Sequence, residues 1–336
     1  QTGRMLKAHP RLLEESVPFN MEADSLNASI LGLDAVPGTP EFDIFIKATQ
    51  AEMTVKAGQK CTAIRRIMVP ESLMEDVQIA LGQRLGKTTI GNPQEEGVRM
   101  GSLATKVQVD RVRENVEKLA ASQEMVYGDL ENFSVSGADK NAGAFFSPVL
   151  FRNDDPFNKT DVHNIEAFGP VSTLMPYKTV DEAVELTAMG KGSLVTSIVT
   201  ADDKIAREFV VEAAHTNGRI LVLNEKCAKE STGHGSPMPM LTHVGRGRAG
   251  GGEEMGGKRG VLHYMQRTAI QGHPDTITNI TEQYQNGAAR PEANPHVFRQ
   301  HFEELNVGDT VYTHSHTVTD ADIASFAQVS GDNFYA

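Results

Sequence analysis

The chain has 336 residues, a formal net charge of -12 and only two cysteines. The negative charge disfavours binding to nucleic acid or to an anionic membrane, because both need positive potential, and no apolar run approaches the roughly 18 residues of a membrane-spanning helix. Two cysteines make no disulfide framework and fit a reducing, cytoplasmic location. We therefore predict a large globular protein of two or three domains with a small-molecule partner.

Helices and strands alternate along the chain. Capping-box spacing predicts helices that begin before Leu73, Val180 and Ala201, and apolar residues at helical spacing predict an amphipathic helix over about 104–121. The expected strands are 64–69, 171–177, 194–200 and 220–223. This succession is typical of a parallel sheet with right-handed crossovers. We predict an α/β fold of three layers, with helices on both faces of a parallel sheet.

Residues 58–62, GQKCT, place Cys61 in a turn ahead of the first of these strands. Gly58 lets the backbone come close to a substrate, and backbone N–H groups in a turn can lower a thiol pKa or hold an oxyanion. Alone, the pattern is weak, because most free cysteines are inert packing. We interpret Cys61 as a candidate nucleophile and Cys227, which lacks a glycine turn, as structural.

Two further segments strengthen this interpretation. Residues 19–27 read FNMEADSLN upstream of Cys61, and residues 164–171 read NIEAFGPV downstream of it. In this order the three motifs resemble the aldehyde dehydrogenase superfamily, and the resemblance extends over roughly residues 1–272. Within the superfamily, the sequences of residues 19–27 and of the cysteine turn are most similar to the PaaZ type, the bifunctional proteins of phenylacetate degradation.

The resemblance implies site residues and a cofactor. Cys61 would attack an aldehyde, and Glu22 would activate the water that releases the acid. Glu166 and Phe168 would hold the nicotinamide ribose of NADP, with NAD as the alternative cofactor. The PaaZ type further implies a semialdehyde linked to coenzyme A as the substrate. The family's usual Glu-Leu-Gly-Gly is replaced by Glu-Ala-Asp-Ser at 22–25, so we expect the backbone beside the base to differ.

Each of these residues also has a plainer interpretation. Glu22 could be a solvated surface carboxylate, and Glu166 with Phe168 could be the end of a helix or strand with a core phenylalanine.

The stretch 245–252 contains a formal Gly-x-Gly-x-x-Gly, but no buried strand precedes it, so we interpret it as a flexible loop rather than a phosphate cradle. In aldehyde dehydrogenases such a stretch lies near the substrate tunnel.

The resemblance divides the chain into five parts. These are 1–57, the C-terminal part of a dinucleotide-binding domain; 58–260, the catalytic domain; 261–272, an oligomerisation strand; 273–295, a linker; and 296–336, the beginning of a MaoC-like hydratase domain. The strand would pair with a second copy, giving a homo-oligomer. The family's oxyanion asparagine and adenine-ribose contacts would precede Gln1, so we expect the chain to be part of a longer protein.

The last part resembles the start of a hot-dog (α+β) hydratase. Asp332 matches its catalytic aspartate, and the partner histidine would follow Ala336; alternatively, Gly331 and Asp332 form a simple turn. By resemblance, the two activities would open oxepin-CoA and oxidise the semialdehyde to 3-oxo-5,6-dehydrosuberyl-CoA.

Two other functions remain open from the sequence. The chain could be an aldehyde dehydrogenase for another aldehyde, or an assembly module that keeps the fold without the chemistry. No short-spaced zinc motif occurs, so no metal is expected.

Overall fold

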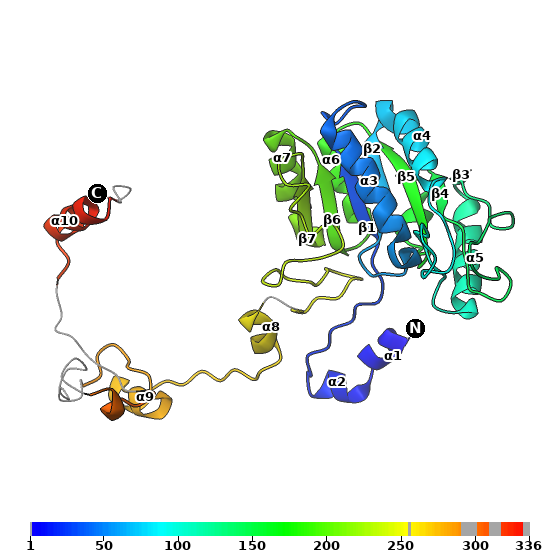
Figure 1. Cartoon of the computed structure of the whole chain (residues 1–336). Helices are drawn as coiled ribbons and strands as arrows, with labels where there is room; N and C mark the ends of the chain where they lie inside the picture. The colour runs from blue at the N-terminus through cyan, green and yellow to red at the C-terminus, as the bar shows by residue number, and fades with distance from the viewer. Residues whose placement is uncertain (1, 255–256, 290–300, 309–316, 332–336) are drawn as a thin grey trace. The chain divides into compact units, whose positions relative to one another are not determined.

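The computed structural model describes residues 2–254, 257–289, 301–308 and 317–331. The chain divides into two compact units, Gln1–Met265 and Gln266–Ala336, and the first holds a seven-stranded sheet (Figure 1). Its strands are β1 (Asn27–Leu31), β2 (Ile64–Pro70), β3 (Glu124–Tyr127), β4 (Val149–Arg152), β5 (Val171–Tyr177), β6 (Ser193–Val199) and β7 (Asn217–Leu223). They are arranged in the order β3-β4-β5-β2-β1-β6-β7.

Every neighbouring pair of strands is parallel except β3 and β4, which run antiparallel. In the centre, Ile30 of β1 lies opposite both Met68 of β2 and Ile198 of β6. The predicted parallel sheet is therefore confirmed, and β3 adds an antiparallel strand at one edge. Between β3 and β4 the loop 128–148 turns the chain back without a crossover helix, which allows the antiparallel pairing.

Helices cover both faces of the sheet. Those of the first unit are α1 (Thr2–Lys7), α2 (Pro10–Glu14), α3 (Pro40–Thr54), α4 (Met74–Leu85), α5 (Lys106–Ala120), α6 (Val180–Met189), α7 (Asp203–Ala213) and α8 (Lys258–His263). Short 3-10 helices are η1 (Val55–Gly58), η2 (Glu71–Leu73), η3 (Thr160–His163) and η4 (Ala214–Thr216). Because α3 and α4 pack on one face and α5, α6 and α7 on the other, the predicted three layers are confirmed.

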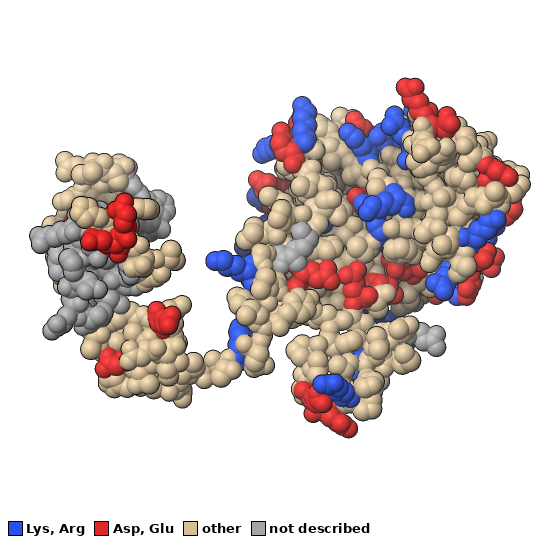
Figure 2. Space-filling view, turned by 60° about the horizontal axis from the view of Figure 1, so that its bottom comes forward, with Lys and Arg blue, Asp and Glu red and all other residues tan. Residues whose placement is uncertain are grey.

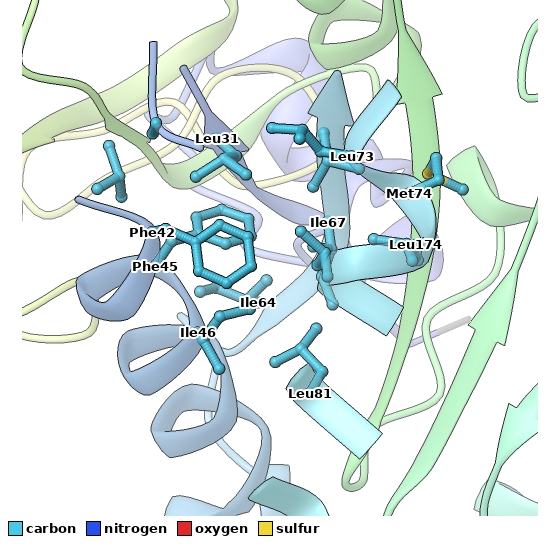
Figure 3. Close-up of a cluster of buried hydrophobic side chains, with 14 of the residues drawn as sticks. Leu31, Phe42, Phe45, Ile46, Ile64, Ile67, Leu73, Met74, Leu81 and Leu174 are labelled. Carbon is cyan, nitrogen blue, oxygen red and sulfur yellow. The ribbon is translucent and has the colours of Figure 1, made fainter. Parts of the chain in front are cut away.

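The core lies on the two sides of β1 and β2. On one side, Phe42, Phe45 and Ile46 of α3 pack against Leu31 and Ile67, as Figure 3 shows. Alternation along each strand sends the intervening residues to the opposite face. Burial of each large apolar side chain in this cluster stabilises the fold by about 1.5–3 kcal/mol before conformational entropy is subtracted. The apolar strands therefore fix the sheet that carries the site.

On the other face, the alternate strand residues Ile30, Met68 and Ile198 pack against Leu186 of α6 and Phe209 of α7. A third buried cluster lies under α5, where the predicted amphipathic helix buries Val112, Val116 and Leu119. These packed faces confirm the helix expected over 104–121, with bounds inside that range.

All four predicted strands are present, although β7 begins three residues early, and one of the three predicted caps is correct. Thr179 caps α6 by accepting the Glu182 N–H at 3.2 Å. Thr200 instead donates to Asp34 at 2.5 Å, and Asp202 caps α7. Ser72 lies inside η2, where its side chain caps nothing. Local spacing alone did not reveal these competing partners.

The structure describes two of the parts assigned above by resemblance. Residues 27–57, assigned to a dinucleotide-binding domain, form β1, which lies in the same sheet as β2, and α3, which packs on that sheet. In the single chain, α8 (Lys258–His263) covers the start of 261–272 and the remaining residues contain no strand, so the oligomerisation strand, which needs a second copy, stays a prediction. A lone strand leaves its backbone polar groups unpaired, whereas a helix satisfies them locally.

The second unit is described by its own elements. They are α9 (Pro274–Thr281), η6 (Phe302–Glu304) and α10 (Asp320–Ser330), and its described residues include no strand. Helix α9 lies within the expected linker, where Pro274 opens it and His273 caps it. The hot-dog fold is not visible in these residues, and Asp332 lies outside the described residues.

Charged side chains are spread over the surface of the first unit. Figure 2 shows Lys and Arg side chains lying among Asp and Glu side chains on the face that it presents. None of the described helices is long and apolar enough to cross a membrane.

Candidate active site

Three segments meet at the amino ends of β1, β2 and β5. They are 22–26 before β1, 58–63 before β2 and 164–170 before β5, and the parallel pairing of these strands brings their beginnings together. Open α/β sheets usually bind ligands at the carboxyl ends of their strands. Here the residues singled out by the sequence gather at the opposite end.

The turn before Cys61 has a tightly constrained backbone. Lys56 and Ala57 adopt positive φ angles of 53° and 52°, and Gly58 follows at 68°. A β-carbon at Gly58 would lie 2.2 Å from the carbonyl oxygen of Gly169. Only glycine permits this approach, which is made to the Gly169 segment, whereas the sequence predicted an approach to a substrate. The cysteine turn therefore packs directly against the segment before β5.

Asn27 holds the other side of this turn. Its side-chain amide donates to the carbonyl oxygens of Cys61 at 2.8 Å and Ala63 at 2.9 Å. Its oxygen accepts from the Ser25 hydroxyl at 2.7 Å and from the Val195 N–H at 3.2 Å. Each polar atom of this buried amide is therefore engaged, so Asn27 fixes the cysteine turn relative to β1 and β6.

The Cys61 thiol is free and half-buried. Burial raises its pKa, and the negative charges of Glu22 and Glu166 raise it further, while the backbone N–H groups of Cys61 and Thr62 lower it. The charges of Glu22 and Glu166 therefore disfavour the thiolate, whereas the backbone N–H groups of Cys61 and Thr62 favour it. The same two donors could stabilise an oxyanion formed beside the sulfur.

Arg65, on β2, joins the cysteine turn to the Glu166 segment. Its guanidinium donates to the carbonyl oxygens of Gly169 at 2.6 Å and Gly58 at 2.7 Å. Its Nε lies 3.7 Å from Glu166 Oε1, and its carbon lies 5.5 Å from the ring centroid of Phe168. Sequence analysis missed this residue. The available signal was a pair of arginines inside an apolar strand, because buried charges need partners.

Glu166 is nearly buried, with 11% of its side chain exposed. Burial raises its pKa to about 7, although the positive charge of Arg65 acts in the opposite direction. Its Oε1 makes no hydrogen bond with the described residues. A buried acceptor without a donor suits a hydroxyl-bearing ligand, so the geometry favours the binding interpretation of Glu166 over a plain helix end.

Glu22 is exposed beside the glycine-rich loop. Its backbone pairs with Ala249, and the N–H of Ala23 donates to the carbonyl oxygen of Arg248 at 3.1 Å. Partial burial and the negative charge of Glu254 raise the Glu22 pKa. A raised pKa brings a carboxylate closer to the range in which it exchanges protons at neutral pH. Glu22, Cys61, Glu166 and the Phe168 segment are thus brought together, as expected.

A protein-family comparison agrees with this geometry. Residues 7–270 match the model of the aldehyde dehydrogenase family, which is most of the chain. This chain belongs to the aldehyde dehydrogenase family. It is 50% identical over 238 residues to "Protein MaoC" of Klebsiella aerogenes, covering 70% of this chain and 69% of that protein.

Two other proteins are also similar to this chain. It is 41% identical over 244 residues to the 3,4-dehydroadipyl-CoA semialdehyde dehydrogenase of Aromatoleum evansii, covering 73% of this chain and 47% of that protein. Betaine aldehyde dehydrogenase of Staphylococcus aureus, solved with NAD+, has a TM-score of 0.67 at 22% identity, covering 78% of this chain and 48% of that one. The chain thus spans about half of these two relatives, and the last shows the fold alone.

The residues expected to hold the nicotinamide ribose in an aldehyde dehydrogenase fit that group. Glu166 presents an Oε1 that accepts no hydrogen bond from the described residues, and the Phe168 ring is 36% exposed. Gln59 fixes the Phe168 segment by donating to its carbonyl oxygen at 3.2 Å and accepting from the Ala104 N–H at 2.7 Å. Among the described residues, no group of three or more His, Cys, Asp or Glu side chains is arranged to hold a metal ion.

Proposed function

We propose that this chain forms the catalytic part of an NAD(P)-dependent dehydrogenase that oxidises a CoA-linked semialdehyde to the acid. The observation that carries the proposal is that the segments bearing Glu22, Cys61 and Glu166 meet at the amino ends of β1, β2 and β5. The substrate class rests on the name of the Aromatoleum relative. We propose NADP as the preferred cofactor, as the PaaZ-like motifs imply.

In this mechanism the Cys61 thiolate adds to the aldehyde carbon and forms a carbon–sulfur bond. The N–H groups of Cys61 and Thr62 stabilise the oxyanion. The nicotinamide, when bound, supplies the acceptor for the hydride that leaves this carbon. Cys61 then carries a thioester. Glu22 accepts a proton from water as the water attacks the thioester carbon, and the acid departs as the carbon–sulfur bond breaks and the Cys61 thiolate returns.

We also propose that the hydratase resemblance of 296–336 reflects a second activity in the whole protein, the opening of oxepin-CoA, with Asp332 as a catalytic residue. Its support is the MaoC name of the Klebsiella relative and the short α10, which ends at Gly331 directly before this aspartate.

Association with a second copy is a further part of the proposal. Four exposed apolar side chains around α8 support a contact surface there: Val261, Leu262, Tyr264 and Met265. A reducing, cytoplasmic location fits the requirement for a free Cys61 thiol.

The test uses the full-length protein, 3,4-dehydroadipyl-CoA semialdehyde and, in parallel, the same semialdehyde without CoA. Formation of NADPH and NADH is followed for wild type, Cys61→Ala and Cys227→Ala. Cys227 is a matched control because it is also a half-buried free cysteine, packed against the core near β7. We expect turnover to vanish only in Cys61→Ala. Turnover that survives this substitution refutes the thiol mechanism, and equal activity without CoA refutes the substrate class.

A further inference from the structure

The glycine-rich stretch 245–252 contains an arginine whose side chain reaches the base segment. Arg248 binds both carboxylate oxygens of Asp24, two residues from Glu22. Its guanidinium also donates to the carbonyl oxygens of His163 and Asn164, each at 3.1 Å. Only 17% of the Arg248 side chain is exposed. A bidentate arginine–carboxylate pair has a fixed geometry, so Arg248 links the segments that carry Glu22 and Glu166.

The backbone of the loop holds the same segment. The carbonyl oxygen of Arg248 accepts from the N–H groups of Ala23 at 3.1 Å and Asp24 at 3.5 Å, and Ala249 pairs with Glu22. The base segment is therefore attached to the loop through both the side chain and the main chain of one residue.

The loop itself is firmly seated. The Arg248 N–H donates to the carbonyl oxygen of Lys191 at 3.1 Å, and a β-carbon at Gly247 would lie 2.1 Å from the same oxygen. Gly192 comes equally close to Arg246, because a β-carbon there would lie 2.0 Å from the Arg246 carbonyl oxygen. The glycines allow this close approach. The stretch expected to be a flexible loop is thus anchored to the connection between α6 and β6.

Glu22 has no comparable support of its own. Its side chain is exposed and makes no hydrogen bond with the described residues. The position of its α-carbon therefore depends on the backbone at 22–24, which Arg248 holds. We propose that Arg248, through Asp24, is a positioning residue for Glu22. This inference rests on the proposed function and assigns Arg248 to the step in which water releases the acyl group from Cys61.

The kinetic test separates acylation from hydrolysis in the full-length protein. Rapid mixing with the CoA-linked semialdehyde gives a burst of reduced cofactor for acylation and a steady rate limited by hydrolysis. We expect Arg248→Met to keep the burst rate within roughly twofold and to lower the steady rate by about 10–100-fold, because small displacements of a base are costly. Arg248→Lys should restore part of this loss, since lysine keeps the charge but not the bidentate geometry.

Three further variants test whether Arg248 affects the steady rate through Asp24 and Glu22. Arg246→Met is the matched control, because Arg246 lies in the same loop, is exposed and makes no side-chain bond with the described residues; we expect no change. Asp24→Asn, a milder change, should resemble Arg248→Met. In a Glu22→Gln background, Arg248→Met should lower the steady rate by less than roughly twofold, because residues that act through one group are not additive.

A burst slowed as much as the steady rate, or a further tenfold loss in the Glu22→Gln background, would overturn the positioning role. Amide hydrogen exchange at Ala23 tests it without any substrate. We expect Arg248→Met, but not Arg246→Met, to speed exchange there by about tenfold or more while β1 stays protected. Absence of any reduced cofactor in wild type would refute the proposed function, and unchanged exchange at Ala23 would refute the positioning role on its own.

Discussion

Arg65 and Arg66 are neighbours on β2, both almost fully buried, yet they bind different partners. Arg65 pairs with Glu166, a carboxylate with a pKa of about 7. Arg66 faces α6, where it donates to the carbonyl oxygens of Leu186 at 2.7 Å and Thr187 at 3.1 Å. The register with β1 shifts between these two residues, since Asn27 pairs with Ile64 and Ala28 with Arg66, so Arg65 lies at an irregularity of the strand. Arg65 is thus paired with a titratable carboxylate, whereas Arg66 is bound to backbone carbonyl groups.

The environment of Arg66 explains how a cation is held there without a carboxylate. Its two acceptors belong to the last turn of α6, whose carbonyl groups lack helical partners and carry partial negative charge. It also donates to the Leu26 carbonyl oxygen at 2.8 Å and lies 3.2 Å from His163 Nδ1. Burial and the charge of Arg66 lower the pKa of His163 to about 4, so the ring is neutral at pH 7 and accepts this bond. Arg66 therefore stabilises the fold through its bonds to backbone carbonyl groups, whereas the charge of Arg65 is coupled to the protonation of Glu166.

The largest expected effect on stability comes from replacing Arg66. Arg66→Met removes a buried cation from three carbonyl groups and should lower the free energy of unfolding by roughly 3–5 kcal/mol. The loss should be equal at pH 6 and pH 8, because His163 is neutral at both. Urea unfolding of the full-length protein measures it, and Arg111→Met, an exposed arginine on α5, should stay within about 0.5 kcal/mol of wild type. A loss in the free energy of unfolding that differs between these two pH values contradicts a purely structural role for Arg66.

Arg65→Met should cost less, roughly 1–3 kcal/mol, and the cost should depend on pH. The pKa of Glu166 is already raised, so its contribution to stability is present below about pH 4.5 and is lost as pH rises through about 7. Removing Arg65 raises this pKa further and extends the loss to higher pH. The penalty should therefore be larger at pH 8 than at pH 6. An equal penalty at both would show that Arg65 acts through its carbonyl bonds alone.

The smallest effect concerns the thiol. Because the charges of Glu22 and Glu166 raise the Cys61 pKa, Glu22→Gln and Glu166→Gln should each lower it. More thiolate is then present at mildly alkaline pH, so iodoacetamide should alkylate Cys61 faster than in wild type. Mass spectrometry of the modified peptide across pH gives the rates. Arg66→Met, which changes contacts to Leu26, Leu186 and Thr187, should leave the profile unchanged, and a shift there would end the distinction between the two arginines.

Local patterns predicted elements well where burial follows periodicity. The apolar run of β2 and the spacing in α5 were sufficient, because their own residues dictate which face is buried. Caps and edges were less predictable. Thr200 has cap spacing but bonds to Asp34, more than a hundred residues away in the sequence. Residues 261–272 have strand-like alternation, but pairing requires another edge, and α8 forms at their beginning.

The sequence by itself was enough to predict the family and the three-layer fold, and it singled out the candidate site residues Cys61, Glu22 and Glu166, because each stands in a distinctive short motif. Only the tertiary structure decided how these residues are held and charged. Arg65 meets Gly169 across 104 positions and Arg248 meets Asp24 across 224, and no local pattern encodes such pairings. Burial among these distant segments, rather than the identity of the side chain, brings the pKa of Glu166 to about 7.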